Sequence, residues 1–507
     1  MTAPPPRSRD GPSGKLEGMT ERQGPVRRRL VLATCCLSIF IVSLDNTIVN
    51  VALPSIRRDL DASVSELQWT IDAYTLVLAG LLMVSGSTAD RVGRRKIFRL
   101  GLTLFSLGSL LCSLAPSAAA LVAFRALQGV GGSMLNPVAM SIIRNTFTDA
   151  RERAQAIGIW GAVVGLSMAL GPLVGGLLVA GISWRAIFWV NLPVGVLAFV
   201  LTQRFVPESR APKPRRIDPL GQGLVIVALG SLVYAIIEGA DAGWGSPRIV
   251  GCATLSVVAL TLLVRHERRH PEPLMDPRFF RSVPFSGASL IAIAAFTALG
   301  GFLFLTNLYL QGDRGLSAAE SGLYTLPMAA TAFVAAPLSG RLVGGRSARP
   351  SLVIGGAGLA LGSVMLTGLS ATTATPLLLT AYFLFGLGFG MVNPPITNTA
   401  VSGMPQEQAG VAAAVASTSR LVGISLGVAI VGAIAVPAAG VAAAHGGFAA
   451  ASHPGWWLLT ACGVGVVALG LISTSAWALQ TASAVAAGAT SRGWVPLRGT
   501  RLSEPGG

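Results

Sequence analysis

The chain has 507 residues, of which 52% are hydrophobic and only 12% are charged, and its mean hydropathy is +0.65. A soluble protein would carry roughly 25% charged residues, so a soluble globular protein is excluded. The formal net charge of +16 is compatible with a nucleic-acid-binding protein, but the basic residues follow a membrane pattern instead. We therefore expect an integral membrane protein that contacts the lipid bilayer and has no nucleic-acid partner.

Fourteen apolar segments are long enough to cross a bilayer as helices. They lie near residues 28–53, 67–88, 98–115, 118–143, 155–181, 185–203, 219–238, 249–264, 284–311, 321–340, 351–370, 375–400, 409–436 and 455–478. The first segment lacks a convincing cleavage site, so we expect it to be retained in the protein. Residues 1–27 and 479–507 are rich in Pro, Gly, Ser, Ala or Arg and are expected to be tails.

The basic residues are distributed unevenly between the two sides of these segments. Thirty-one of the 38 Lys and Arg lie in the tails and in the loops of one side, five lie on the other side, and two, Arg125 and Arg420, lie within segments. Because an excess of Lys and Arg marks the cytoplasmic side, we expect both termini in the cytoplasm and a multi-pass protein of the cell membrane. The preference for Arg over Lys is typical of GC-rich bacterial genomes.

The cysteines and histidines do not indicate a disulfide framework, a metal site or a catalytic site. The five cysteines all lie within apolar segments, so no disulfide framework is predicted. The four histidines show no metal-ligand spacing, and no catalytic constellation stands out in the loops. We predict no metal site, no cofactor and no enzymatic activity.

An internal repeat divides the chain. The segment FRALQGVGGSMLNP (124–137) corresponds to YFLFGLGFGMVNPP (382–395), and Gly129, Asn136 and Pro137 match residues 257 positions later. Parallel repeats of this kind mark transporters built from two helix bundles. We therefore predict an all-α integral membrane protein with two six-helix bundles, 28–206 and 284–478, and a linker with an inserted two-helix hairpin at 207–283.

The first two segments each carry one acid. SLDNTIVNVALP (43–54) places Asp45 about 13 Å from the outer end, and WTIDAYTL (69–76) places Asp72 about 8 Å deep. Burial disfavours a charged acid, whereas a nearby arginine favours it, so such an acid is suited to taking up and releasing a proton. For Asp45, proton coupling or recognition of a cation stands against a structural ion pair. For Asp72, the functional and structural interpretations stay equally open.

The loop GSTADRVGRRK (86–96) joins the second and third segments at the cytoplasmic edge. Its only acid, Asp90, can pair with the arginines around it or cap the N-terminus of a facing helix, and so latch the two bundles together. The alternative is that the loop is basic only because cytoplasmic loops are rich in Lys and Arg. That alternative does not explain the presence of Asp90 or of the glycines. The candidate gating residues are Gly86, Asp90, Arg91, Gly93, Arg94 and Arg95. The corresponding loop of the second half, GRLVGGR (340–346), lacks the acid.

The two intramembrane arginines need partners, because an unpaired charge is costly in lipid. Arg125, in LVAFRALQGVGG (121–132), lies about 10 Å deep, at a depth similar to that of the two acids. It is expected either to tune proton exchange by a nearby acid or to form a static ion pair. Arg420 lies near mid-membrane. It either faces the central cavity, toward an acid of the first bundle or an acceptor on a substrate, or binds backbone carbonyls. Further cavity candidates are Asn46, Asn50, Asn136 and Asn393.

The fifth segment contains GIWGAVVGLSMALGPLVGGLL (158–178), which has no charge and six glycines. In lipid such a helix is tolerated, because neighbouring helices satisfy the freed backbone groups. The small residues allow close approach of other helices, and a kink is expected at the proline. The residues singled out here are Gly161, Gly165, Gly171, Pro172, Gly175 and Gly176. The alternative is a tightly packed helix with no role in coupling.

These motifs resemble those of a known family. The loop 86–96 is similar to the GxLaDrxGrr signature of the major facilitator superfamily, with Thr88 in place of the usual Leu, and 158–178 resembles the motif of its antiporters. The stretches 43–54, 184–195 and 309–327 resemble signatures of the 14-helix drug:proton antiporter family (EmrB/QacA subfamily). The resemblance covers nearly all of 28–478.

The resemblance implies a monomeric, proton-coupled exporter of amphiphilic small molecules, driven by the proton motive force without a cofactor. One rival is a dedicated exporter of a single endogenous metabolite or antibiotic. Another is a membrane receptor or regulator without transport, which needs neither the half-repeats nor the intramembrane charges. A nucleotide-driven pump is disfavoured, because no lysine lies in a GxxxxGK[ST] loop.

Overall fold

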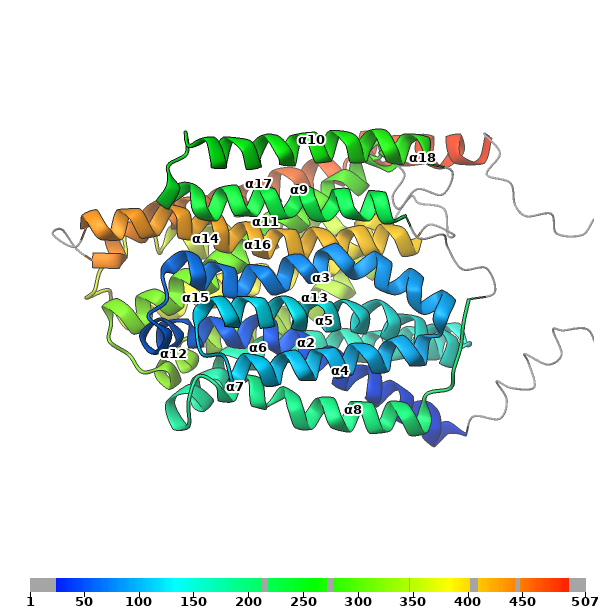
Figure 1. Cartoon of the computed structure of the whole chain (residues 1–507). Helices are drawn as coiled ribbons and strands as arrows, with labels where there is room; N and C mark the ends of the chain where they lie inside the picture. The colour runs from blue at the N-terminus through cyan, green and yellow to red at the C-terminus, as the bar shows by residue number, and fades with distance from the viewer. Residues whose placement is uncertain are drawn as a thin grey trace, which may run out of the picture.

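The computed structural model describes residues 24–211, 218–270, 277–345, 347–401, 409–442 and 447–491. The regular structure in these ranges is entirely helical, and most helices run side by side along one direction (Figure 1). The first half comprises α2 (Pro25–Leu60), α3 (Val64–Val92), α4 (Arg94–Ser113), α5 (Ala118–Thr146), α6 (Ala150–Gly181), α7 (Ala186–Trp189) and α8 (Asn191–Phe205).

A two-helix hairpin, α9 (Pro219–Ala242) and α10 (Pro247–Arg269), follows the first half. The second half begins with the 3-10 helix η1 (Pro277–Arg281). Its further helices are α11 (Val283–Leu308), the π-helix η2 (Tyr309–Asp313), α12 (Ala318–Tyr324), α13 (Leu326–Gly345), α14 (Ala348–Val364), α15 (Thr375–Val401), α16 (Ala409–Ala442), α17 (Gly447–Ser473) and α18 (Ala476–Ser491).

Twelve helices in the described part of the chain are long and apolar enough to cross a membrane, or thirteen if the bent α6 counts as one span. This confirms a multi-pass all-helical membrane protein. The predicted number of fourteen is not confirmed, because the segment predicted at 351–370 forms a shorter apolar helix, α14, of 17 residues.

Several helices differ from the predicted segments at their ends. The α2 helix runs six residues beyond Pro54, because a proline lacks only one backbone donor and does not stop a helix by itself. Two segments predicted as single helices are interrupted, the sixth between α7 and α8 and the tenth between α12 and α13. Both interruptions precede a Leu-Pro pair, and proline is tolerated in the first turn of the new helix.

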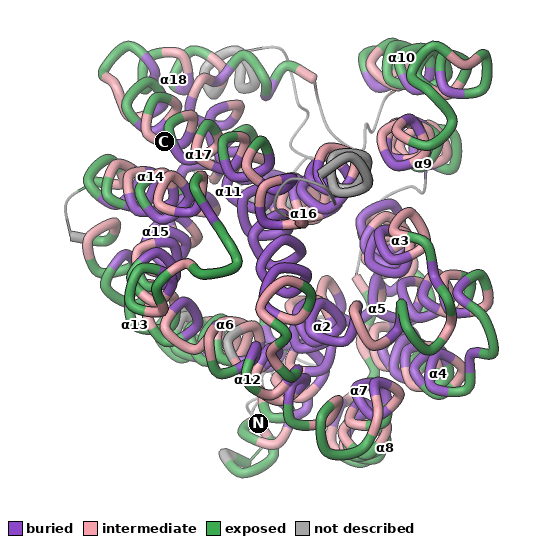
Figure 2. Tube along the Cα trace, turned by 90° about the vertical axis from the view of Figure 1, so that its left-hand side faces the viewer, coloured by how far each residue is buried: buried purple, intermediate pink, exposed green. Residues whose placement is uncertain are grey.

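The two halves repeat one packing arrangement. A Cβ atom on Gly129 of α5 would lie 2.7 Å from the carbonyl oxygen of Tyr74 on α3. A Cβ on Gly386 of α15 would clash in the same way with the carbonyl of Met328 on α13. Glycines 257 positions apart therefore allow the same close helix contact in each half. In the second half α11 is the most enclosed helix, buried along nearly its whole length (Figure 2).

The α9–α10 hairpin lies at the edge of the helix assembly. Its first helix packs between α3 of the first half and α16 of the second, while α10 packs mainly on α9 (Figure 2). The Nε1–H of Trp69 on α3 donates to Glu238 of α9 at 2.9 Å. This acid, at the end of the seventh predicted segment, therefore connects the hairpin to the first half.

Candidate functional site

A buried ion pair joins α2 to α5. The Nη1 atom of Arg125 lies 2.5 Å from Oδ2 of Asp45, and their side chains are 1% and 0% exposed. The other carboxylate oxygen of Asp45 accepts hydrogen bonds from the side-chain amides of Gln128, at 2.9 Å, and Asn191, at 3.2 Å. The predicted proximity of Asp45 and Arg125 is therefore present, and both oxygens of this carboxylate have partners.

Arg125 makes further contacts beside this ion pair. Its Nε–H donates to the carbonyl of Thr70 at 2.9 Å, Nη1 donates to Gln128 at 2.7 Å, and the guanidinium lies 4.3 Å from the ring centre of Tyr74. Sequence reasoning missed Gln128 and Asn191. Gln128 follows Arg125 by three residues and so shares its helix face, which was a usable signal. Asn191 comes from α8, and no local pattern connects it to the pair.

Asp72 lies apart from this network. It is completely buried in α3, and neither of its carboxylate oxygens has a hydrogen-bond partner in the part of the chain that the structure describes. The hydroxyl of Ser425 on α16 lies near this carboxyl group, but the two do not meet the geometry of a hydrogen bond. Asp72 and Arg125 were expected at a similar depth in the membrane, but the structure does not pair them. Its surroundings oppose a charge, because a buried carboxylate without a counter-charge is costly.

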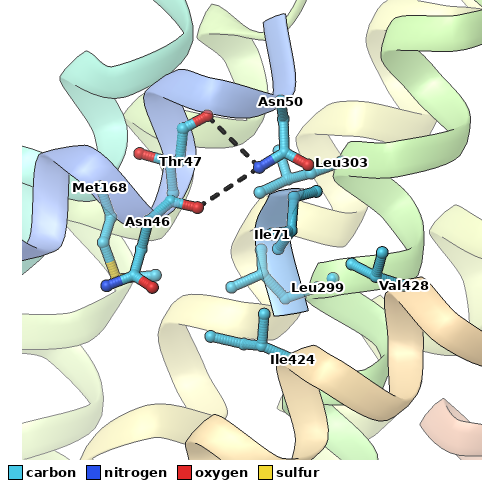
Figure 3. A pocket seen from close by; sticks show the side chains of 10 residues that line it. Asn46, Thr47, Asn50, Ile71, Met168, Leu299, Leu303, Ile424 and Val428 are labelled. Atoms are coloured by element: carbon cyan, nitrogen blue, oxygen red, sulfur yellow. Dashed lines mark hydrogen bonds between the residues drawn. The ribbon is translucent and has the colours of Figure 1, made fainter. Parts of the chain in front are cut away.

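A pocket opens between the two halves (Figure 3). From the first half it is lined by Asn46, Thr47 and Asn50 of α2, Ile71 of α3 and Met168 of α6. The second half contributes Leu299, Gly300 and Leu303 of α11 with Ile424 and Val428 of α16. Apolar side chains dominate this lining, and the polar atoms are amides and a hydroxyl without charge. Such a lining suits an apolar ligand that carries a few polar groups.

The four asparagines proposed for the cavity separate into two pairs. Asn46 and Asn50 line the pocket, and their side-chain amides donate to carbonyls one turn back in α2. The Oδ1 atom of Asn50 is buried and has no partner among the described residues, so it is available to a ligand donor. Asn136 and Asn393 are half-buried and are not part of this lining.

Arg420 lies within the second half. Its Nη2 donates to the hydroxyl of Thr397 at 2.6 Å and to the carbonyl of Asn393 at 3.4 Å, both on α15. No acid of the first half pairs with it among the described residues. Of the interpretations offered for Arg420, helix packing through hydroxyl and carbonyl groups is the one that this geometry supports.

The glycine-rich α6 contacts both halves. The helix bends by 40° between Met168 and Leu170, one turn before Pro172, which lacks the N–H that would bond the carbonyl of residue 168. Beyond the bend, Gly171 and Gly175 lie against Thr47 and Ile48 of α2.

Two further contacts beyond the bend cross to the second half. A Cβ on Gly176 would clash with the carbonyl of Ala318 on α12, and a Cβ on Gly322 would lie 2.5 Å from the carbonyl of Pro172. Before the bend, a Cβ on Gly161 or Gly165 would meet no atom within 4 Å. The predicted glycine face is therefore a contact surface in only half of the helix.

The halves are closed against each other at one end, which we call the closed end and which carries α12 and the link between α2 and α3. There, Gln68 of α3 donates its side-chain amide to the carbonyls of Val428 at 3.1 Å and Ala429 at 2.9 Å. Gln311 of η2 donates to the carbonyl of Val51 at 2.8 Å. Sequence reasoning missed both glutamines, because each bonds a backbone group of a helix distant in the chain.

The candidate gating loop lies at the opposite end. Asp90 accepts from Nε of Arg94 at 2.9 Å, within one helical turn. Gly93 has φ of 130°, and a Cβ there would lie 2.7 Å from the carboxylate of Glu208, which also accepts from the N–H of Arg95. Gly86 lies against Pro137 of α5. The acid is therefore paired with an arginine of its own loop, and a latch between the halves remains a prediction.

Comparison with known proteins agrees with this architecture. The profile of the Major Facilitator Superfamily matches residues 35–428. The chain is 39% identical over 405 residues to the multidrug resistance protein Stp of Mycobacterium tuberculosis, covering 80% of this chain and 75% of Stp. It is 37% identical over 432 residues to the tetracenomycin C resistance and export protein of Streptomyces glaucescens, covering 83% of this chain and 78% of that protein.

A solved structure shows the same fold. It is the inward-facing, unoccupied form of a bacterial homolog of the human lysosomal transporter Spinster, with a TM-score of 0.63, 19% identity, and coverage of 92% of this chain and 99% of that one. The family match and the relatives, together with the two helical halves, define a membrane transporter rather than an enzyme. The chain belongs to the Major Facilitator Superfamily.

Proposed function

We propose that this protein is a proton-coupled exporter of amphiphilic small molecules that works by alternating access. The largely apolar lining of the pocket between the halves supports this function, because an amphiphile that enters when the halves separate can contact these apolar side chains and bond Asn50. The names of the relatives, a multidrug resistance protein and a resistance and export protein, support the same substrate class. The energy source is the proton motive force.

The observation that carries proton coupling is the isolation of Asp72. It is buried at the contact of α3 with α16, beside the bonds from Gln68 that close this end. A carboxyl group without a counter-charge is suited to hold a proton while the halves are closed around it. When the halves separate at this end, water can solvate the carboxylate and the proton can leave. The state of the closed end and the protonation of Asp72 are thereby linked.

The Asp45–Arg125 pair has a different role in this proposal. Its charges compensate each other and are held by Gln128 and Asn191. It fixes α2, which carries Asn46 and Asn50 to the pocket, against α5 and α8. Asp45 thus positions the pocket wall, and Asp72 exchanges the proton.

The proposed architecture has fourteen spanning helices, with bundles 28–206 and 284–478 and the α9–α10 hairpin inserted between them. The matched contacts of Gly129 and Gly386 support the division into bundles. The charge distribution supports a cytoplasmic location of both termini, which makes the closed end the outer end. In this orientation the conformation is closed to the outside. The proposed unit is a monomer.

Reconstituted protein in proteoliposomes tests the function, with ethidium as the substrate probe. An imposed pH gradient should drive accumulation of ethidium, and equal rates after collapse of the gradient would contradict proton coupling. Asp72→Asn should bind ethidium with affinity within about twofold of wild type and fail to accumulate it. Accumulation by this variant at the wild-type rate would assign the proton site to another residue.

Breadth of substrate is a separate question. A transporter of one endogenous compound would be expected to carry several directional polar groups in its pocket, whereas this lining offers Asn46, Thr47 and Asn50 among apolar side chains. We therefore favour broad specificity. A susceptibility panel of chemically unrelated drugs in an efflux-deficient host checks this, and protection against a single compound would favour a dedicated exporter.

A further inference from the structure

Two histidines and one aspartate meet at the base of the α9–α10 hairpin, outside the central pocket. Asp218 precedes α9 and accepts a hydrogen bond from the N–H of Gly221 at 2.9 Å. His266 and His270 lie one turn apart at the end of α10. Because the two helices run antiparallel, these ends come together (Figure 1). No local sequence pattern predicts this cluster, because Asp218 is 48 residues from His266.

The three side chains converge on one point. Nε2 of His266 lies 2.8 Å from Oδ2 of Asp218, and one ligand atom from each residue lies within 4.8 Å of the others. Ligand atoms around a tetrahedral Zn²⁺ ion, each at about 2.0–2.2 Å from the metal, lie roughly 3.3–3.6 Å from one another. Binding of an ion therefore requires that the direct contact of His266 with Asp218 open and that the three side chains shift by about an ångström. Asp218 is 3% exposed, so it is a fixed ligand, while His266 is half-buried and accessible.

A second carboxylate borders the same space. A Cβ on Gly221 would lie 2.6 Å from Oδ2 of Asp218 and 2.8 Å from Oε1 of Glu267, which is buried. The absence of a side chain at Gly221 therefore leaves room where two carboxylate oxygens approach.

We propose that Asp218, His266 and His270 bind a divalent transition-metal ion, with Zn²⁺ as the favoured species. Two imidazole nitrogens and one carboxylate oxygen suit Zn²⁺, Co²⁺ and Ni²⁺, and three protein ligands leave a position for water or for Glu267. The ion holds the first turn of α9 to the last turn of α10. It therefore fixes the hairpin at the point where the chain continues toward η1 and the second half.

Metal binding to the full-length protein tests this proposal. The protein carries a tag without histidine, is stripped with EDTA and dialysed in detergent, and is titrated with ZnCl₂ by calorimetry. Wild type should bind one Zn²⁺ per chain, and Co²⁺ should give a visible absorption band. His266→Ala and His270→Ala should each weaken binding at least about tenfold. His453→Ala is the matched control, because this histidine contacts the carbonyl of Leu369 elsewhere, and it should bind as wild type.

Two results would overturn the metal site. One is wild-type protein that binds no Zn²⁺ above the level of the double variant of His266 and His270, which would leave the cluster as an ion pair only. The other is unchanged stoichiometric binding in that double variant, which would place the metal elsewhere. His270→Gln, with size-exclusion profiles of every variant, separates loss of a ligand from loss of the fold. With zinc, wild type should also unfold at a higher temperature than in EDTA, and the double variant should show no such difference.

Discussion

The guanidinium of Arg125 lies 2.5 Å from the carboxylate of Asp45, and helices of the first half completely enclose the two charges. Removing one partner leaves a buried charge without compensation, which typically costs about 3–5 kcal/mol. Removing both partners leaves no unpaired charge and therefore costs less than the sum of the two single changes. This relationship also explains why Asp45 and Asp72 are expected to behave differently, although both are buried acids of the first two helices.

Truncation of Asp45 and Arg125 should be strongly non-additive. We expect Asp45→Ala and Arg125→Ala each to lower the free energy of unfolding in mixed micelles by about 3 kcal/mol. The double variant should be less destabilised than the sum of the two, with a coupling of at least about 1 kcal/mol. Asp59→Ala with Arg185→Ala is the matched control, because this pair is partly exposed and its coupling should be small. Additive losses at the buried pair would contradict the network.

The two acids should respond oppositely to neutralisation. Asp72→Asn removes a carboxyl that has no hydrogen-bond partner among the described residues, so the melting temperature should stay equal or rise. Asp45→Asn leaves Arg125 without its counter-charge, so the melting temperature should fall by several degrees. Differential scanning fluorimetry at neutral pH compares them directly. Equal falls for both variants would mean that Asp72 has a stabilising partner of its own.

Neutralising Asp90 should impair transport and spare the fold. Its pair with Arg94 is partly exposed, and such pairs contribute only about 0–1 kcal/mol. Asp90→Asn should therefore fold and insert normally but transport ethidium several-fold more slowly, if the loop acts as a latch. Glu152→Gln, which breaks the exposed pair with Arg28, is the control and should transport normally. Normal transport by Asp90→Asn at normal expression would remove the latch from the mechanism.

Side chains added to α6 should act according to their position along the helix. Gly176→Leu collides with the carbonyl of Ala318 and should open the closed end. Gly161→Leu meets no atom within 4 Å and should leave that end closed. The reporter is Asn46→Cys, which lines the pocket, labelled with a membrane-impermeant maleimide from the outer side. Several-fold faster labelling is expected for Gly176→Leu alone, and equal rates in both backgrounds would show that this contact does not hold the end closed.

The sequence by itself determined the class of the protein and the inventory of its charges. Fourteen apolar segments, an uneven distribution of arginines and the repeat of Gly129 at Gly386 were sufficient to predict a multi-pass transporter with two halves. Depth along a helix can be counted from its ends, so Asp45 and Arg125 were expected at similar depth, and the structure brings their side chains together. The short length of α14 was not predicted, because hydropathy does not define where a helix ends.

The tertiary structure alone decided which of these groups meet. Hydropathy gives the depth of a residue but not the rotation of its helix, which is set by packing against neighbouring helices. Arg125 is turned toward Asp45, and Asp72 is turned toward α16. The bonds of Gln68 to backbone carbonyls and the approach of His266 to Asp218 likewise join positions that no local pattern relates. Such contacts depend on the relative placement of whole helices, which the sequence of any single helix does not contain.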